Sequence, residues 1–450
     1  MTSNYSLELS LQLRNLIRED LLKNMMDEFP FEKVRQMERG ENKRDRVYNS
    51  ENTLLTMLMT SFMEDKSLQN SVNIFQGIFE ARSKELIELQ IKNLEQEVKR
   101  LPEEKKRGRP KSFKPRIAKS KQTGVSQNTA AYSKARQRLN IELVEEVFNF
   151  SKVFPVESQI KWQGMITYLL DGCYFQMQDT PALRKKYYVR ENDGAYPQGL
   201  LEALICQGVG YISDFRIGTR HQSELELAFK MLDSLPGNSL ILADDLYNSY
   251  AIFSKILETN NHIIVPGRRQ RSYKVVQTLA PGDQIVRIKR TTKPNWLKEK
   301  NNFAESITLR RITYRSPTSD EEYVLYTTLL DQKILTSDII VKYLTRWDIE
   351  VSIREIKTMM DVNVVRSKTE DMVFKELITA FTAYNMVRKV ITRSVQKTDF
   401  SPKENLIQEF FEGNKELFID KKGRKYKRWS PGRYGKLDEK NKETHFIRQA

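Results

Sequence analysis

Cysteine and histidine are scarce in this chain of 450 residues, and their scarcity excludes several kinds of site. The two cysteines, Cys173 and Cys206, cannot build a disulfide framework or a cysteine-rich zinc site. The three histidines, His221, His262 and His445, are widely spread, so a zinc site is not expected either. A metal site in this protein should therefore use carboxylates, which favours Mg²⁺ or Mn²⁺. So few cysteines are typical of a reducing compartment.

The sequence also lacks the long apolar segments of membrane proteins. It contains no run of eighteen or more apolar residues. Its first twenty residues are interrupted by charges and contain no signal-peptide core. We therefore expect a cytoplasmic protein with no membrane partner.

The chain carries an excess of positive charge, which points to a class of partner. It has 75 Lys and Arg against 59 Asp and Glu, a net charge of +16 and a pI near 9.5. Such an excess favours a polyanionic partner, nucleic acid before an anionic membrane surface. Charge alone is equally consistent with a soluble protein that happens to be basic.

Composition and periodicity divide the chain into seven segments. Apolar residues recur at three-to-four spacing near the N-terminus, which predicts helices, and strand-like and helical runs alternate after residue 160. That alternation predicts a mixed α/β sheet with helices on its faces. The predicted segments are a helical N-terminal region 1–104, a basic linker 105–124, a basic helical segment 125–160, the first part of an α/β core 161–267, a β-rich insertion 268–330, the second part of the core 331–398 and a basic C-terminal tail 399–450.

Two of these segments contain clustered cations that could contact DNA. In the linker, Arg107 and Arg109 belong to "RGRP", which resembles the core of an AT-hook, an extended segment that binds the narrow minor groove of A·T-rich DNA. Farther on, Lys134, Arg136 and Arg138 cluster in a predicted helix that could dock on phosphates or in the major groove. A solvated linker and an ordinary basic surface helix fit the same residues.

Three acidic residues stand in settings that suggest chemistry. Asp171 lies in the apolar strand "YLLDGCY", Asp244 ends the buried run "LILAD", and Glu350 lies in the helical segment 343–357. A buried carboxylate is costly alone, so such groups pair with cations or bind metal. Two strand-borne aspartates and a helix-borne glutamate can hold two divalent ions about 3.5–4 Å apart. For any one of them, a salt bridge or a helix cap is the alternative.

The segment 343–357, "YLTRWDIEVSIREIK", predicts one amphipathic helix. At about 100° per residue, four polar side chains project from one face. They are Tyr343, Arg346, Glu350 and Lys357. An apolar stripe on the adjoining face is predicted to anchor the helix to the core. It consists of Leu344, Trp347 and Val351.

These four polar residues form the pattern Y-x2-R-x3-E-x6-K, which resembles the signature of DDE transposases of insertion-sequence family four. The segments "LDGCYFQMQDTP" and "LILADDLY" resemble the two aspartate motifs of that family, and "TTLLDQK" resembles the lead-in to its signature helix. The resemblance runs in consistent order over roughly residues 125 to 395.

The resemblance implies a fold, a cofactor and roles for particular residues. The implied fold is a ribonuclease H-like mixed sheet with helices on both faces, interrupted by an all-β insertion and preceded by a helical DNA-binding region. Asp171, Asp244 and Glu350 would bind two Mg²⁺ ions, for which Mn²⁺ could substitute, and would carry the catalysis. Tyr343, Arg346 and Lys357 would hold DNA phosphates, a role that suits their chemistry.

Three residues need separate comment. Asp245 stands where the family often has arginine, and alignment through "LAD" selects Asp244 as the ligand while leaving Asp245 as a possible one. Cys173 stands where the family often has a small hydroxyl residue, and we predict no nucleophilic role for it. Trp296, in the insertion, could stack on an extruded base or simply fill the insertion's core.

The function implied by the resemblance is cut-and-paste DNA transposition. The enzyme would cleave double-stranded DNA at the terminal inverted repeats of an insertion sequence and join the freed ends to target DNA. Two DNA ends must be held together, so a homodimer is expected in the synaptic complex, in the bacterial cytoplasm at the nucleoid. The alternatives are a repurposed, non-catalytic DNA-binding protein and a ribonuclease H-like nuclease that performs no strand transfer.

Overall fold

The structure, a computed structural model, describes ten stretches of the chain. They are residues 29–38, 46–61, 65–77, 128–154, 161–187, 195–267, 271–291, 294–297, 303–315 and 321–396. Residues 26–387 form one compact unit, and of the second unit, Met1–Met25 with Arg388–Ala450, only residues 388–396 are described. The predicted linker with Arg107 and Arg109 and the predicted tail 399–450 lie outside the described residues.

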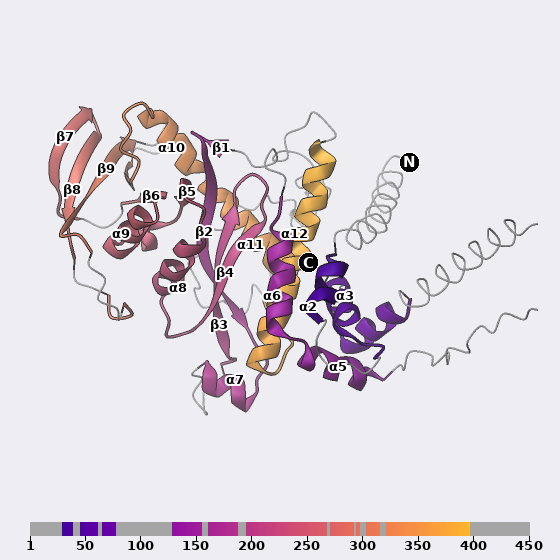
Figure 1. The fold of residues 1–450 in the computed structure, drawn as a ribbon. Coiled ribbons are helices and arrows are strands. Elements are labelled where there is room, and N and C mark those ends of the chain that lie inside the picture. Colours follow the sequence, from indigo (N-terminus) through magenta and orange to yellow (C-terminus); the bar gives the residue numbers. More distant parts are fainter. Residues whose placement is uncertain are drawn as a thin grey trace, which may run out of the picture. The chain divides into compact units, whose positions relative to one another are not determined.

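A ten-stranded sheet forms the centre of the unit 26–387 (Figure 1). Its core strands are β2 (Met165–Gln176), β3 (Gln198–Cys206), β4 (Ile212–Thr219), β5 (Ser239–Leu242) and β6 (His262–Pro266), and the short β1 (Lys161–Trp162) pairs with β2. β2, β3 and β4 are antiparallel neighbours, whereas β5 runs parallel to β2 and β6 parallel to β5. The order β4-β3-β2-β5-β6 confirms the mixed, ribonuclease H-like sheet.

Four further strands come from the predicted β-rich insertion. They are β7 (Lys274–Ala280), β8 (Asp283–Lys289), β9 (Ser306–Arg315) and β10 (Glu322–Thr327). Each pairs antiparallel with the next, and β10 also pairs antiparallel with β6. The insertion therefore lengthens the core sheet as far as β7 at its edge.

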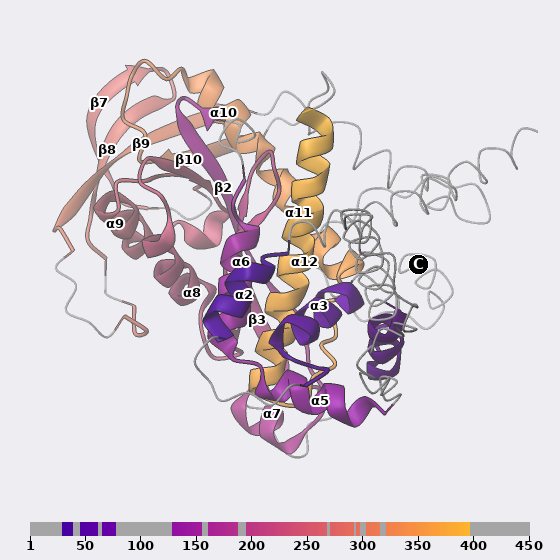
Figure 2. The same ribbon diagram turned by 45° about the vertical axis from the view of Figure 1, so that its right-hand side comes forward.

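Helices cover both faces of the core strands (Figures 1 and 2). On one face lie α8 (Glu224–Met231) and α9 (Tyr250–Glu258), and on the other lie α6 (Ile141–Ser151), α11 (Asp348–Met359) and α12 (Glu370–Gln396). Three shorter elements join the core strands and helices, namely α7 (Pro181–Lys186), η3 (Leu232–Ser234) and η4 (Asp245–Tyr247). This is the arrangement that alternating strand-like and helical runs predicted.

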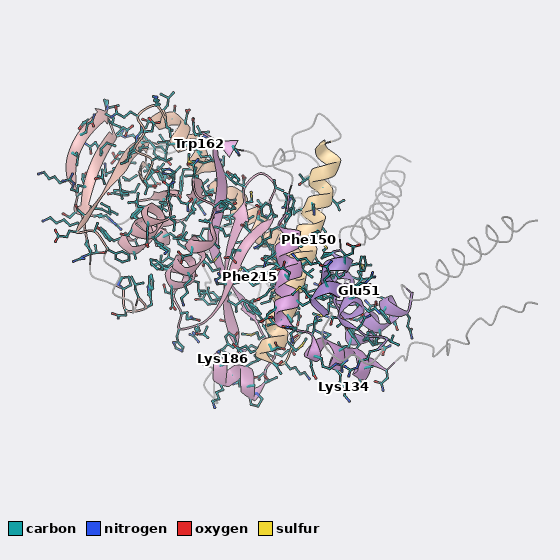
Figure 3. The ribbon with its side chains drawn as sticks, viewed as in Figure 1. Glu51, Lys134, Phe150, Trp162, Lys186 and Phe215 are labelled. Carbon is teal, nitrogen blue, oxygen red and sulfur yellow. The ribbon has the colours of Figure 1, made fainter. Side chains whose placement is uncertain are left out.

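The core strands are buried because apolar side chains project from both of their faces. All four residues of β5 are buried, as expected for a central parallel strand. Ile241 of β5 belongs to the cluster that includes Phe253 of α9. On the opposite face, Phe215 of β4, which Figure 3 labels, packs against Phe148 of α6 and Phe381 of α12, with ring centroids 5.3 and 4.8 Å apart.

The described part of the N-terminal region is helical. It contains α2 (Phe31–Glu38), α3 (Ser50–Ser61) and a helical segment 68–77, and α5 (Thr129–Arg138) packs against α3. The basic segment 125–160 was predicted to be helical, and its described residues form two helices, α5 and α6, separated at Leu139 and Asn140. The side chain of Asn140 accepts a hydrogen bond from the Glu142 amide and so caps α6, which explains the division. None of the helices in the described ranges is both long and apolar enough to cross a membrane.

Candidate active site

Asp171 and Asp244 lie side by side because their strands are neighbours. β2 and β5 are parallel, with Leu169 opposite Leu242, and each aspartate comes two residues after its member of that pair. Neighbouring strands lie about 4.8 Å apart, and side chains two residues apart project to the same face. The sheet therefore places two carboxylates together at the carboxyl end of β5, where α/β sheets commonly bind ligands.

The environment of Asp171 shows that the two carboxylates interact. Burial and then the charge of Asp244 raise the pKa of Asp171 to about 7, while the Gly172 amide and Arg346 oppose the shift. The Gly172 amide donates to Asp171 Oδ1 over 2.9 Å. The negative charge of one carboxylate disfavours ionisation of the other, and a cation between them would offset that repulsion. The pair is therefore suited to binding a metal ion.

The chain turns immediately after β5, and Asp244 shapes the turn. Its side chain accepts a hydrogen bond of 2.8 Å from the Leu246 amide and caps η4. Asp245 is the first residue of η4 and is partly exposed. The cap holds the Asp244 carboxylate at the end of the strand, beside Asp171.

The segment 343–357 is less regular than predicted. α10 (Thr336–Leu344) is followed by a single 3₁₀ turn, η5 (Thr345–Trp347), and only then by α11. A 3₁₀ turn winds more tightly than an α-helix and rotates the residues after it. The prediction that Leu344, Trp347 and Val351 anchor the helix is wrong, because these side chains are 50%, 54% and 49% exposed. The residues of α11 that are buried instead are Ile349, Ser352, Glu355 and Ile356.

Gln207, in the turn after β3, holds the 3₁₀ turn in place. Its side-chain amide donates to the carbonyl and the hydroxyl of Thr345 over 3.2 and 2.7 Å and to Asp348 Oδ2 over 3.0 Å. Its carbonyl oxygen accepts from Lys342 Nζ over 2.7 Å. A side chain from the core sheet therefore contacts α10, η5 and α11 together, and this fixes Arg346 within η5.

Arg346 interacts with both Glu350 and Asp171. Its guanidinium lies 3.6 Å from Glu350 Oε1, and its charge lowers the pKa of Asp171 against the stronger effect of burial. The side chains of Arg346 and Glu350 are only 15% and 20% exposed. Arg346 thus acts on both Glu350 and Asp171, but the structure does not gather Glu350 with the two aspartates into the predicted three-carboxylate site. Within the described ranges, no three His, Cys, Asp or Glu side chains are grouped closely enough to hold an ion.

The other two signature residues lie in the same neighbourhood. Burial raises the pKa of Tyr343 to about 12, and Arg346 and Asp244 are among the charges that act on it. The Lys357 ammonium lies beside Cys173. Burial raises the pKa of the Cys173 thiol to about 11 despite Lys357, so the thiol is protonated at neutral pH, in line with the prediction that it is no nucleophile.

Comparison with known proteins identifies the family. A family model described as the transposase DDE domain matches residues 162–386, half of the chain and all of the region just described. The chain belongs to the DDE transposase family. Membership implies dependence on a divalent metal ion, and the carboxylate donors of Asp171 and Asp244 fit such an ion.

Two curated transposase relatives come from Escherichia coli (strain K12). The chain is 27% identical over 278 residues to the transposase InsG for insertion sequence element IS4, with 58% of this chain and 60% of InsG covered. It is 30% identical over 166 residues to InsZ, with 34% of this chain and 55% of InsZ covered. The chain thus spans 60% or less of the length of either relative. Among solved structures, a piggyBac transposase synaptic complex with hairpin DNA has a TM-score of 0.32 and 12% identity, and covers 55% of this chain and 51% of that one.

Two further carboxyl groups interact electrostatically with the aspartates of the DDE domain, and neither was predicted from the sequence. Glu202 is fully buried on β3, and burial raises its pKa well above the ordinary range. Glu224, the first residue of α8, also has a pKa raised by burial and by Asp244. A signal for Glu202 was available, because it interrupts the otherwise apolar run "GLLEALIC".

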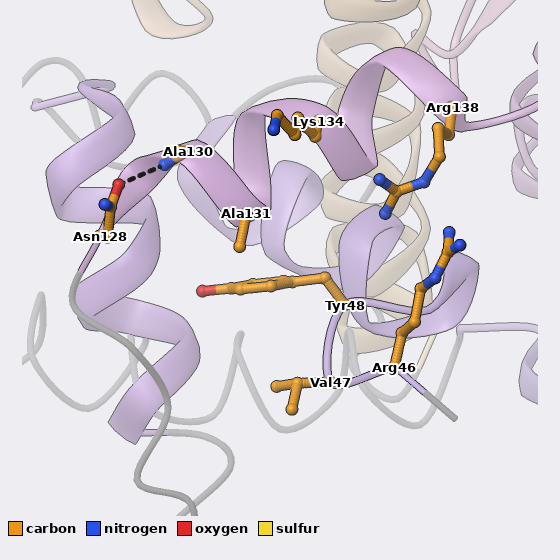
Figure 4. A pocket seen from close by; sticks show the side chains of 8 residues that line it. All are labelled: Arg46, Val47, Tyr48, Asn128, Ala130, Ala131, Lys134 and Arg138. Carbon is orange, nitrogen blue, oxygen red and sulfur yellow. Dashed lines mark hydrogen bonds between the residues drawn. The ribbon is translucent and has the colours of Figure 1, made fainter. Parts of the chain in front are cut away.

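Lys134 and Arg138 are presented by α5, outside the DDE domain match. Together with Arg46, Tyr48 and Asn128 they line a pocket of about 530 Å³ (Figure 4). Figure 4 shows Arg46 and Arg138 reaching the same side of the pocket from two different segments. Arg136 does not line this pocket, and its guanidinium lies over the Tyr132 ring, 5.8 Å from the centroid.

Trp296 is partly buried against the core. Its ring meets Phe229 of α8 edge to face, with centroids 5.5 Å apart, and packs against the apolar cluster of the core. Trp296 therefore connects the insertion, to which it belongs, with α8.

Proposed function

We propose that this protein is a transposase that cleaves DNA at the ends of an insertion sequence and joins the freed ends to target DNA. One observation carries the proposal: Asp171 of β2 and Asp244, two residues beyond the parallel strand β5, act on each other beside the helices that carry the family signature. The membership of residues 162–386 in the DDE family supports the same reaction, as do the transposase relatives.

The metal ions are proposed to be two Mg²⁺, with Mn²⁺ as a substitute. Asp171, Asp244 and Glu350 would hold them, since all three offer hard oxygen ligands and two of them already act on each other. When bound, the ions would supply an activated water or 3′-hydroxyl and would stabilise the leaving oxygen of the phosphodiester. Asp245, one residue along η4, is the alternative second ligand.

Tyr343, Arg346 and Lys357 are proposed to hold the phosphates of the reacting strand. Arg346 can donate two parallel hydrogen bonds to a phosphate, and Lys357 adds a compact positive charge. The pKa of Tyr343, raised to about 12 by burial, keeps its hydroxyl neutral and able to donate. These residues would orient the phosphodiester toward the aspartates.

The helical region is proposed to bind duplex DNA beyond the cleavage site. Lys134 and Arg138 are exposed on α5 and line a pocket together with Arg46. Replacing Lys134 and Arg138 by Ala should weaken binding to DNA of any sequence and reduce the salt slope of the affinity by about one for each residue. Lys230→Met, which removes an exposed cation of α8 paired with Glu226, is the matched control and should leave that slope unchanged.

Other parts of the proposal concern residues and partners beyond this site. Arg107 and Arg109 are proposed to add minor-groove contacts, and Trp296 remains a candidate for base stacking during cleavage. The active assembly is proposed to be a homodimer that pairs two DNA ends in the cytoplasm, at the nucleoid.

Plasmid cleavage tests the proposal. The wild-type chain with Mg²⁺ should cut a supercoiled plasmid that carries the element's ends and should produce joined products. Asp171→Asn should lose cutting but keep end binding, whereas Asp179→Asn, which changes an exposed carboxylate paired with Arg184, should cut normally. Cleavage that survives Asp171→Asn would overturn the assignment. A wild type that binds without cutting would indicate a non-catalytic DNA-binding protein, and cutting without joining would indicate a nuclease.

A further inference from the structure

Glu202 is an unusual residue for the interior of a sheet. It lies in the middle of β3, is 0% exposed, and has Leu201 and Ala203 as buried neighbours. A buried carboxyl group requires partners, since it has lost its hydration. Glu202 Oε1 accepts a hydrogen bond of 2.6 Å from the Tyr247 hydroxyl, while Oε2 has no hydrogen-bond partner.

The carboxyl group of Glu202 lies directly over the strand that carries Asp171. Glu202 is paired with Gly172 in the antiparallel register of β2 and β3. A Cβ atom on Gly172 would lie 2.8 Å from Glu202 Oε2 and 2.9 Å from Glu224 Cδ. Glycine at position 172 therefore leaves room for the carboxyl groups of Glu202 and Glu224 against β2.

Tyr247 connects Glu202 to the other aspartate. Tyr247 is the last residue of η4, is fully buried, and follows Asp244 by three positions. Asp244 caps the same turn through the Leu246 amide. The hydrogen bond from Tyr247 to Glu202 therefore attaches the Asp244 turn to β3, which is itself paired with the Asp171 strand.

We infer that Glu202 and Tyr247 are positioning residues that fix the Asp244 carboxylate relative to Asp171 for metal binding. The chain of contacts runs from Asp171 through the β2–β3 pairing to Glu202, then through Tyr247 and η4 to Asp244. This inference rests on the proposed function, in which the two aspartates hold a divalent ion. Partners that orient metal ligands in this way typically contribute about 10- to 100-fold to metal affinity.

Direct binding of Mn²⁺ to the full chain, measured by electron paramagnetic resonance of the free ion, tests the inference without relying on catalysis. Tyr247→Phe and Glu202→Leu each remove the hydrogen bond and should raise the Kd for Mn²⁺ about tenfold or more. Glu202→Gln keeps an oxygen that can accept from Tyr247 and should restore a Kd near that of wild type.

A matched control separates positioning from stability. Tyr250, the first residue of α9, is also buried, and its hydroxyl donates to the Ala304 carbonyl over 2.6 Å. Tyr250→Phe should lower the thermal unfolding midpoint as Tyr247→Phe does, but should leave the Kd for Mn²⁺ unchanged.

The result that overturns the inference is a Kd for Mn²⁺ within twofold of that in Tyr250→Phe, measured in whichever of Tyr247→Phe and Glu202→Leu folds. Two positions are used so that a misfolded variant at one leaves the other informative. Failure of the proposed function has a different signature, namely Mn²⁺ binding by Asp171→Asn that equals wild type.

Discussion

The ion pair between Arg310 and Asp283 offers the sharpest test of how the insertion is attached to the DDE domain. Both side chains are almost fully buried, with exposed fractions of 3% and 2%. Arg310 Nε donates to Asp283 Oδ1 over 2.9 Å, and Nη1 donates to the carbonyls of Asp331 and Ile334 over 3.1 and 2.9 Å. Asp283 also accepts from the Thr336 hydroxyl. The pair therefore connects β8 and β9 to the start of α10.

Removing one charge should be far more damaging than removing both. Asp283→Asn leaves the Arg310 charge buried without a counter-charge, which we expect to cost about 3–5 kcal/mol of unfolding free energy. The double replacement of Asp283 by Leu and Arg310 by Met replaces the pair with apolar groups and should cost much less than the single change, because no charge is left to desolvate. Urea unfolding followed by circular dichroism measures both values.

Two comparisons complete this test. Asp179→Asn breaks an ion pair with Arg184 in which Asp179 is exposed, and should hardly change the urea midpoint. Burial alone would raise the pKa of Asp283, but the hydrogen bonds from Arg310 and Thr336 outweigh it and hold the pKa below its usual range. The folded state therefore favours the ionised carboxylate, and wild-type stability should fall as pH drops below about 4. Equal losses in Asp283→Asn and in the double variant would refute the reasoning.

Three further predictions follow from single contacts. Because burial and then Asp244 raise the pKa of Asp171 from 3.8 to about 7, the folded chain keeps a proton that the unfolded chain loses, and stability falls as pH rises through that range. Asp171→Asn without metal should therefore melt above wild type at pH 8 in calorimetry, with the difference shrinking toward pH 4; a constant difference contradicts this. Gln207→Leu removes both hydrogen bonds from Gln207 to Thr345 of η5 and should slow Mg²⁺-dependent cleavage about tenfold or more while DNA binding persists. Unchanged cleavage would show that Gln207 does not position Arg346. Gly282→Ala should destabilise by more than about 1 kcal/mol in urea, because Gly282 has φ +78° and a Cβ would lie 2.6 Å from the Thr313 carbonyl oxygen; wild-type stability would show that the β7–β8 turn relaxes.

The strands were predictable because their signals are local. The apolar run of β5 and the alternating residues of the insertion strands, with turn residues between them, lie within a few positions of one another. The family resemblance implied a shared site for Asp171 and Asp244, but the parallel pairing of β2 with β5 that brings them side by side is visible only in the fold.

The features that sequence reasoning missed depend on partners far away in the chain. The 3₁₀ turn at 345–347 is fixed by Gln207, and no periodicity within 343–357 contains that information. The buried stripe was misplaced for the same reason, because Ile349 and Ile356 contact the core while Trp347 is exposed. Glu202 could have been noticed as a charge in an apolar strand, but its partner Tyr247 is visible only in the fold.

The most direct test of the central claim is to locate the bound ion on the polypeptide. Fe²⁺ replaces Mg²⁺ in many carboxylate sites and, with ascorbate and peroxide, cuts the backbone close to where it is bound; mass spectrometry then maps the cuts. We expect cuts near positions 171, 244 and 350, all suppressed by excess Mg²⁺ and absent from Asp171→Asn. Cuts confined to other parts of the chain, or an Asp171→Asn pattern equal to that of wild type, would contradict the account.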